Sequence, residues 1–267
     1  MPKLQVRHVV RVMKPTNWHY DTAKDSGLSF VDRLKACPRE PDPLVYAARM
    51  TAALSIRAAL RAYFRFDIEG RERLPRDRSF VLVANHSSHL DAVSLLSALP
   101  LRSLNRAYPI AARDYFCQND LRLALTAIIA NVMLFDRNEK AADALQLCRR
   151  LLDEPGNVLI MFPEGTRSIN GRVGLFRRGI GSLLAGTQIP VVPCYLDGTF
   201  KAWPKGSRIP RPRRVRLAIG EPRNYESVSQ DDAGVLRICA ELRRGVLSLA
   251  PQLQPHIARP LSEEAYL

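Results

Sequence analysis

Two short polar segments of this chain combine side chains that could move a proton and hold an anion. The first is the run Asn-His-Ser-Ser-His-Leu-Asp at residues 85–91, directly after the apolar residues 80–84. If His86 lies on a turn and Asp91 in the first turn of the next helix, the carboxylate can reach one imidazole nitrogen. A carboxylate in that place fixes the tautomer and stabilises the imidazolium, which leaves the other nitrogen to accept a proton. The spacing therefore predicts that His86 is a general base oriented by Asp91.

The proton that His86 would accept is expected to come from a substrate. The chain has no Gly-x-Ser-x-Gly segment that could present a serine nucleophile, and Ser87 and Ser88 adjoin the histidine rather than face it. A His-Asp pair without its own nucleophile suits direct acyl transfer from an activated thioester to a substrate hydroxyl.

Two other interpretations of the same segment stay open. His86, His89 and Asp91 could bind a metal ion, although no further cluster of ligands accompanies them in the sequence. Alternatively, Asn85 and Asp91 only cap a helix and His86 is an ordinary surface residue.

The second polar segment, Phe-Pro-Glu-Gly-Thr-Arg-Ser at residues 162–168, follows a further apolar run at 158–162. Gly165 permits a sharp turn, and Thr166 and Arg167 offer hydroxyl, backbone amide and guanidinium donors that can converge on one anion. A phosphate fits such a set of donors. The alternative is a plain exit from a strand with a solvated arginine.

Together the two segments resemble the motifs of the glycerolipid acyltransferase family, whose members include 1-acylglycerol-3-phosphate acyltransferases. Asn-His-x4-Asp at 85–91 and Phe-Pro-Glu-Gly-Thr-Arg at 162–167 stand in the family's order and spacing. Two further family blocks have similar segments here. One is 131–137, where Asn131 replaces the family's glycine and Arg137 is its arginine; the other is the proline-flanked run at 189–193. The resemblance covers about residues 66–222.

The resemblance implies a mechanism and a site. His86 would deprotonate the acceptor hydroxyl, with Asp91 orienting it, and the thiol of the donor would leave without a covalent enzyme intermediate. Arg137 would assist four residues in holding a phosphate-bearing acceptor, namely Glu164, Gly165, Thr166 and Arg167. The donor would be acyl-CoA or an acyl carrier protein acting as co-substrate, and no cofactor or metal is expected. The implied fold is of the glycerol-3-phosphate acyltransferase type, with an apolar groove for the acyl chain.

The elements that must position these segments alternate along the chain. Short apolar runs predict strands at 80–84, before Ala111, and at 132–135, 158–162, 189–195 and 215–219. Helices are predicted at 90–99, 115–130, 139–152 and 235–249. Strands separated by helices of this length favour an α/β fold with a mostly parallel sheet flanked by helices, in which ligands gather at the carboxyl ends of strands.

Residues 1–65 are expected to form an N-terminal helical extension, and residues 66–267 the acyltransferase domain. Within the extension, residues 46–64 lack Gly and Pro and predict a helix, on which Arg57, Arg61 and Arg65 recur every four residues. That helix could pack on the domain or lie on a membrane surface with snorkelling arginines.

Composition bounds the partners and the compartment. The formal net charge is +14, and only seven of the 40 basic residues are lysine. A basic run from Lys205 to Arg216 could be a solvated face, dock on anionic lipid or bind an acidic acyl carrier. Nucleic acid is not expected, because neither aromatic interleaving nor a binding module accompanies the charge.

Five scattered cysteines without a CxxC spacing indicate a reduced cytosolic protein. No stretch reaches the roughly 20 apolar residues of a spanning helix. We therefore expect a peripheral protein on the cytoplasmic side of a membrane, and we expect that membrane to be a bacterial inner membrane.

The expected reaction gives phosphatidic acid from 1-acylglycerol-3-phosphate. Alternative acceptors are a lyso-ornithine lipid, another lysophospholipid or a glycolipid. A protein of a different class, a non-catalytic lipid-binding protein with a degenerate site, is the third possibility.

Overall fold

The structure is a computed structural model that describes residues 43–112, 131–135 and 141–250. Its strands are β1 (Asp67–Glu69), β2 (Phe80–Ala84), β3 (Ala107–Ala112), β4 (Met133–Phe135), β5 (Val158–Met161), β6 (Val191–Asp197) and β7 (Arg216–Ile219). Its helices are α2 (Pro43–Phe64), α3 (Asp91–Ala98), α6 (Ala141–Asp153), α7 (Arg178–Leu184), α8 (Thr199–Ala202) and α9 (Asp232–Ser248). Two short 3₁₀ helices, η1 (Arg71–Arg73) and η2 (Leu101–Arg106), complete the described elements.

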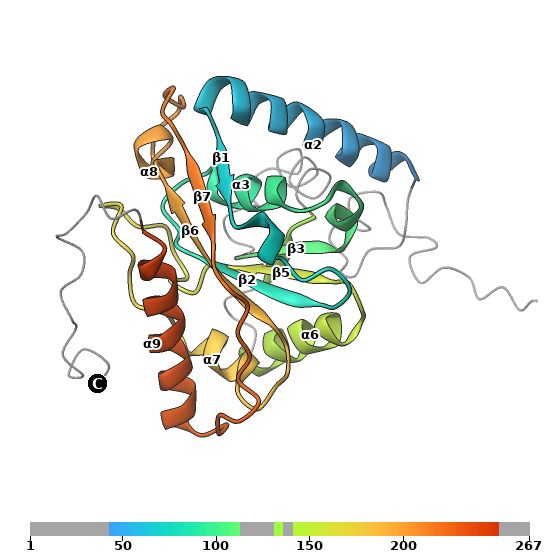
Figure 1. Cartoon of the computed structure of the whole chain (residues 1–267), viewed down its shortest axis with the longest axis vertical. Helices are drawn as coiled ribbons and strands as arrows, with labels where there is room; N and C mark the ends of the chain where they lie inside the picture. The colour runs from blue at the N-terminus through green and yellow to red at the C-terminus, as the bar shows by residue number, and fades with distance from the viewer. Residues whose placement is uncertain (1–42, 113–130, 136–140, 251–267) are drawn as a thin grey trace, which may run out of the picture.

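The strands form one seven-stranded sheet in the order β1-β7-β6-β2-β5-β3-β4. Every neighbouring pair is parallel except β6 and β7, which are antiparallel. Helices α6, α7 and α9 lie on one side of this sheet, and α2 and α3 lie on the other (Figure 1). The predicted α/β class with a mostly parallel, helix-flanked sheet is confirmed.

Most predicted elements are present in the structure. The six expected strands correspond to β2 through β7, and four expected helices, the one at 46–64 included, correspond to α2, α3, α6 and α9. Strand β1 and helices α7 and α8 were not predicted, and the helix expected at 115–130 lies outside the described residues.

Strand β2 is buried along its whole length because its side chains enter two apolar layers. Val81 and Val83 pack with side chains of α6, α7 and α9, whereas Phe80 and Leu82 pack with α3 and η2. A parallel strand in the middle of a sheet has no solvent-facing side, which explains the continuous apolar sequence. This packing fixes the point in space where β2 ends and the polar segment begins.

Helix α2 packs on the α/β domain, as one of the two interpretations of its arginine stripe requires. Leu60 and Phe64 are buried in a small cluster beside α3 and β7, and the Arg57 guanidinium donates to the carbonyl of Leu99. Arg61 and Arg65 are exposed. A membrane-surface role of the extension, and its division from the domain after residue 65, stay predictions. Among the described helices, none combines the length and the apolar character needed to cross a bilayer.

Candidate active site

The two polar segments lie side by side at the carboxyl ends of neighbouring strands. Strands β2 and β5 pair in parallel, with Phe80 opposite Val158 and Val83 opposite Met161. Residues 85–91 leave β2 and residues 162–168 leave β5 at the same edge of the sheet. Parallel pairing therefore brings together segments that are 78 residues apart in the chain.

His86 and Asp91 are in direct contact. The Nδ1 atom of His86 lies 2.8 Å from Oδ2 of Asp91. The same carboxylate oxygen accepts hydrogen bonds from the backbone amides of Ser87 and Ser88, at 2.6 and 2.8 Å. Asp91 is the first residue of α3, where a negative charge is favoured by the helix dipole, and it is fully buried. The carboxylate is thus held rigidly and orients the ring of His86.

The opposite ring nitrogen of His86 is left available. The ring stacks on Phe162, with centroids 4.1 Å apart and planes inclined by 19°. Within the described part of the chain, Nε2 of His86 has no hydrogen-bond partner, and 23% of the side chain is exposed. A ring fixed by Asp91 on one nitrogen and open on the other has the arrangement of a general base.

Backbone hydrogen bonds tie the two segments into one unit. The amide of His86 donates to Oε1 of Glu164 at 2.8 Å. The amide of Gly174 donates to Oε2 of the same carboxylate at 2.8 Å, and the amide of Ser168 donates to the carbonyl of His86, also at 2.8 Å. Both segments are therefore positioned by each other.

Glu164 occupies a place that the sequence did not anticipate. Its side chain is buried, and burial raises its pKa, while the bonds from Gly174 and His86 lower it. Each of its two oxygens already accepts a hydrogen bond from a backbone amide. The carboxylate is therefore directed into the protein rather than toward the lipid that would receive the acyl group. A buried carboxylate that accepts two amides stabilises the loop that it spans.

Gly165 and Thr166 form the exposed tip of the second segment. Gly165 has a φ of 70°, in the left-handed region, and its amide bonds to the carbonyl of Phe162 at 3.0 Å. A Cβ atom there would come within 2.6 Å of Nε of Arg177, so the turn requires glycine. The side chain of Thr166 is exposed beside it.

Arg167 returns from this tip to the first segment, where it contacts His89. Its guanidinium lies 2.9 Å from Nδ1 and 2.6 Å from Nε2 of the His89 ring. Burial lowers the pKa of His89, and the charges of Arg167 and His86 lower it further. A neutral His89 ring is therefore the partner that holds Arg167 next to the His86 segment. Sequence reasoning considered His89 only as a metal ligand, and nothing in the spacing links it to Arg167.

Asn131, which stands in place of the family's glycine, has a backbone that suits glycine. Its φ is 48°, a left-handed value that asparagine tolerates better than most residues. The buried amide accepts from Arg49 and donates to the carbonyl of Asn105 at 3.1 Å. Arg137, predicted as a second phosphate contact, lies outside the described residues.

The other polar residues of the first segment are structural. Asn85 pairs with the backbone of Leu196 in β6, donating at 3.0 Å and accepting at 2.8 Å. The hydroxyl of Ser88 donates to the carbonyl of Trp203 at 2.7 Å. In the described ranges, no three His, Cys, Asp or Glu side chains come together as metal ligands would.

The fold and the site define an acyltransferase domain. The model of the family described as "Acyltransferase" matches residues 65–197, which include both polar segments. The chain belongs to this glycerolipid acyltransferase family, as its two motifs indicate.

Particular relatives make the similarity more specific. The chain is 32% identical over 182 residues to a chloroplastic 1-acyl-sn-glycerol-3-phosphate acyltransferase of Brassica napus, covering 66% of this chain and 49% of that protein. It is 29% identical over 177 residues to the mouse 1-acyl-sn-glycerol-3-phosphate acyltransferase alpha, covering 64% of this chain and 59% of that one. The match thus spans about half to three fifths of the length of these relatives.

A solved structure is similar over a longer range. The crystal structure of the 1-acyl-sn-glycerophosphate acyltransferase PlsC from Thermotoga maritima superposes with a TM-score of 0.57 at 25% identity. The superposition covers 87% of this chain and 89% of that one.

Proposed function

We propose that this protein is an O-acyltransferase that moves a fatty acyl group from a thioester donor to the free hydroxyl of a lysophospholipid. The observation on which the proposal rests is the His86–Asp91 pair, open at Nε2 and bonded through backbone amides to the loop that ends in Arg167. The first candidate acceptor is 1-acylglycerol-3-phosphate, the substrate class in the names of the relatives. Its acylation gives phosphatidic acid.

In the proposed reaction, Nε2 of His86 removes the proton of the acceptor hydroxyl as its oxygen attacks the thioester carbonyl. Asp91 stabilises the imidazolium that forms. The carbon–sulfur bond then breaks, the ester is released, and the proton passes from His86 to the departing thiolate. General base assistance of this kind contributes about 10²- to 10⁴-fold to the rate, and positioning of the two substrates contributes more.

The acceptor's phosphate is proposed to bind at the tip of the second segment. Arg167, the hydroxyl of Thr166 and the backbone beside Gly165 offer the donors, and Arg137 is proposed to assist. The guanidinium of Arg167 is already held next to the His86 segment by His89. An acceptor anchored there by its phosphate would present its hydroxyl to Nε2. Glu164, whose oxygens accept two amides, has the role of positioning the loop.

Loops beside the site suit contact with an anionic lipid surface. The side chains of Ile169 and Ile209 are 83% and 73% exposed. Exposed arginines and a lysine accompany them, among them Arg172, Lys205 and Arg208. Each basic residue near an anionic membrane surface contributes about 1 kcal/mol to the free energy of membrane binding. We propose peripheral binding on the cytoplasmic side of the membrane, a bacterial inner membrane in particular, with these loops bringing the site to its lipid substrate.

The test is product formation by the purified full chain. Radiolabelled acyl-CoA, or acyl carrier protein loaded with the same acyl group, is incubated with lysophosphatidic acid, lysophosphatidylcholine, lyso-ornithine lipid or a monoacylglycerol. Thin-layer chromatography should show labelled phosphatidic acid and little other product. Labelled product from a different acceptor alone would reassign the substrate. Absence of product from every acceptor with both donors would favour the non-catalytic lipid-binding alternative.

A further inference from the structure

A second concave site lies at the edge of the sheet opposite the candidate active site. Its cavity of about 400 Å³ is bounded by Phe80 and Val158, the first residues of β2 and β5. His86 follows Phe80 by six positions, which corresponds to about 20 Å of extended strand. The cavity is therefore separate from the acyl-transfer chemistry, and its volume is in the range typical of small-molecule sites.

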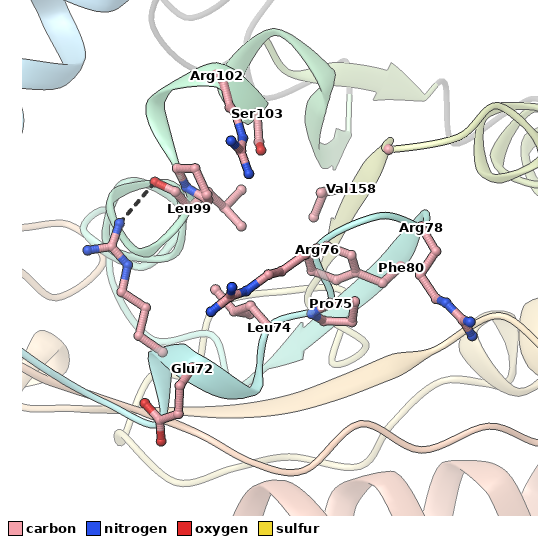
Figure 2. Close-up of a pocket in the computed structure, with 13 residues that line it drawn as sticks. Glu72, Leu74, Pro75, Arg76, Arg78, Phe80, Leu99, Arg102, Ser103 and Val158 are labelled. Carbon is pink, nitrogen blue, oxygen red and sulfur yellow. Dashed lines mark hydrogen bonds between the residues drawn. The ribbon is translucent and has the colours of Figure 1, made fainter.

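The wall of this cavity is unusually rich in arginine. Four arginines and a single acidic residue, Glu72, line it, and the four are Arg71, Arg76, Arg78 and Arg102. We call these four residues and the space between them the arginine pocket. Figure 2 shows Arg102 and Ser103 reaching from η2 toward the guanidinium of Arg76, whereas Arg78 and Glu72 point away from the middle of the space.

Among the described residues, these arginines have no anionic partner. Within the described residues, no hydrogen bond or ion pair engages Arg76, Arg78 or Arg102. Arg71 donates only to the carbonyl of Leu99, at 3.5 Å. Burial lowers the pKa of the nearby Arg57, and the charge of Arg71 lowers it further. Arg76 and Arg102 thus face the same concave space without a counterion among the described residues, an arrangement that favours binding of an anion.

The rest of the wall is apolar. Leu74, Phe80, Leu99 and Val158 line the pocket and belong to the buried layer between the sheet and α3. Guanidinium groups bind phosphate through two parallel hydrogen bonds, and the apolar wall can cover a ring or a hydrocarbon attached to it. The ligand that fits is therefore a phosphate ester rather than a bare inorganic ion.

We propose that the arginine pocket binds a phosphate ester, with Arg76 and Arg102 contacting the phosphoryl group and Ser103 offering a hydroxyl. The ring or hydrocarbon that is attached to the phosphate lies against the apolar wall that Leu74 and Phe80 form. This site is distinct from the one at Arg167, and a ligand can bind to it whether or not His86 is catalytically active.

The experiment separates the two phosphate sites by working in an Arg167→Gln background. Isothermal titration calorimetry at low salt uses adenosine monophosphate and, separately, inorganic phosphate as probes. The Arg167→Gln protein should bind adenosine monophosphate at one site per chain and more tightly than phosphate. Adding Arg76→Gln and Arg102→Gln should weaken binding by at least about tenfold, since each replaces a hydrogen bond to a charged group.

The matched control adds Arg150→Gln instead, an exposed arginine of α6 outside the pocket. It should leave the affinity unchanged. Circular dichroism should show equal melting of all variants, because Arg76 and Arg102 make no hydrogen bond or ion pair with the described part of the chain that the substitutions could remove.

A second arm tests whether the phosphate ester is a lipid headgroup. The same proteins are sedimented with phosphatidylcholine vesicles that contain or lack phosphatidic acid. If the soluble probes do not bind, but the two pocket substitutions abolish binding that depends on phosphatidic acid, the ester is a headgroup and the site stands. The proposal is overturned if neither probe nor vesicle binds, or if binding in both arms is the same with and without the pocket arginines.

Discussion

His86 and His89 lie on the same loop, three residues apart, but their surroundings give them different tasks. The ring of His86 is bound to a buried carboxylate and open on the other nitrogen. The ring of His89 faces the guanidinium of Arg167, and both burial and that charge lower its pKa. One histidine is therefore prepared to accept a proton, and the other to stay neutral and hold an arginine.

Replacing Arg167 by glutamine should reduce acylation of phosphorylated acceptors selectively. A hydrogen bond to a charged group is worth about 1.5–3 kcal/mol, so kcat/KM for lysophosphatidic acid should fall by about 10- to 150-fold. A monoacylglycerol, which lacks the phosphate, should lose little. Steady-state assays with both acceptors measure this. An equal loss for both would remove Arg167 from phosphate recognition.

The state of His89 can be tested through the pH dependence of stability. Its folded-state pKa is lowered, so the unfolded chain binds more protons between that value and the ordinary value of about 6.5. The stability due to the neutral ring is thus present above pH 6.5 and is lost as the pH falls below it. Thermal unfolding should therefore show a smaller loss on acidification in His89→Gln than in the wild type. Identical losses would contradict a neutral His89.

At the level of elements, the site is built where two parallel strands end, and Glu164 joins the loops that leave them. Its contacts reach the amide of His86 in one direction and that of Gly174 in the other. The loop of His86 and the loop of Arg167 thus share one buried carboxylate, although no side chain of β2 or β5 is proposed to touch substrate.

Glu164→Ala should disturb both parts of the site together. It leaves two backbone amides without acceptors, which should lower the free energy of unfolding by about 2–4 kcal/mol. Activity should fall to a similar extent with phosphorylated and unphosphorylated acceptors, unlike the selective loss for Arg167→Gln. Urea unfolding and the two-acceptor assay measure these effects. Glu69→Ala, at an exposed position of β1, is the control and should change neither. A loss confined to phosphorylated acceptors would instead assign Glu164 to the phosphate.

The elements that the sequence predicted are those with strong apolar patterns. Strands β2 and β5, and β6 up to Leu196, are continuous apolar runs because both of their faces are covered. Strand β1 has only three residues, two of them acidic, so its pairing with β7 has no local signal. Helix α7 contains Gly179 and Gly181, which hide its helical propensity.

For the candidate site too, the local features could be predicted from the sequence and the contacts between distant segments could not. The contact between His86 and Asp91 follows from their spacing at the start of a helix, and the turn at Gly165 follows from its residue type. The hydrogen bond between Glu164 and the amide of His86, and the contact of Arg167 with His89, each join residues 78 positions apart. Such pairs depend on the register of β2 against β5, which composition and periodicity do not determine.

At the scale of the whole molecule, the net charge of +14 includes two basic regions for which we propose different roles. Two basic loops with the exposed Ile169 and Ile209 lie beside the candidate active site, and the arginine pocket lies at the opposite edge of the sheet. The two regions are separated by the length of β2. The proposed membrane contact at the loops of Ile169 and Ile209 would therefore leave the arginine pocket open to its proposed ligand.

The most direct test of the proposed chemistry is the turnover number of His86→Ala with acyl-CoA and lysophosphatidic acid. If the imidazole is the general base, kcat should fall by at least about 10²- to 10⁴-fold, while the melting temperature and the affinity for lysophosphatidic acid stay close to those of the wild type. A folded His86→Ala protein that acylates lysophosphatidic acid at a rate within a fewfold of the wild type would contradict the account.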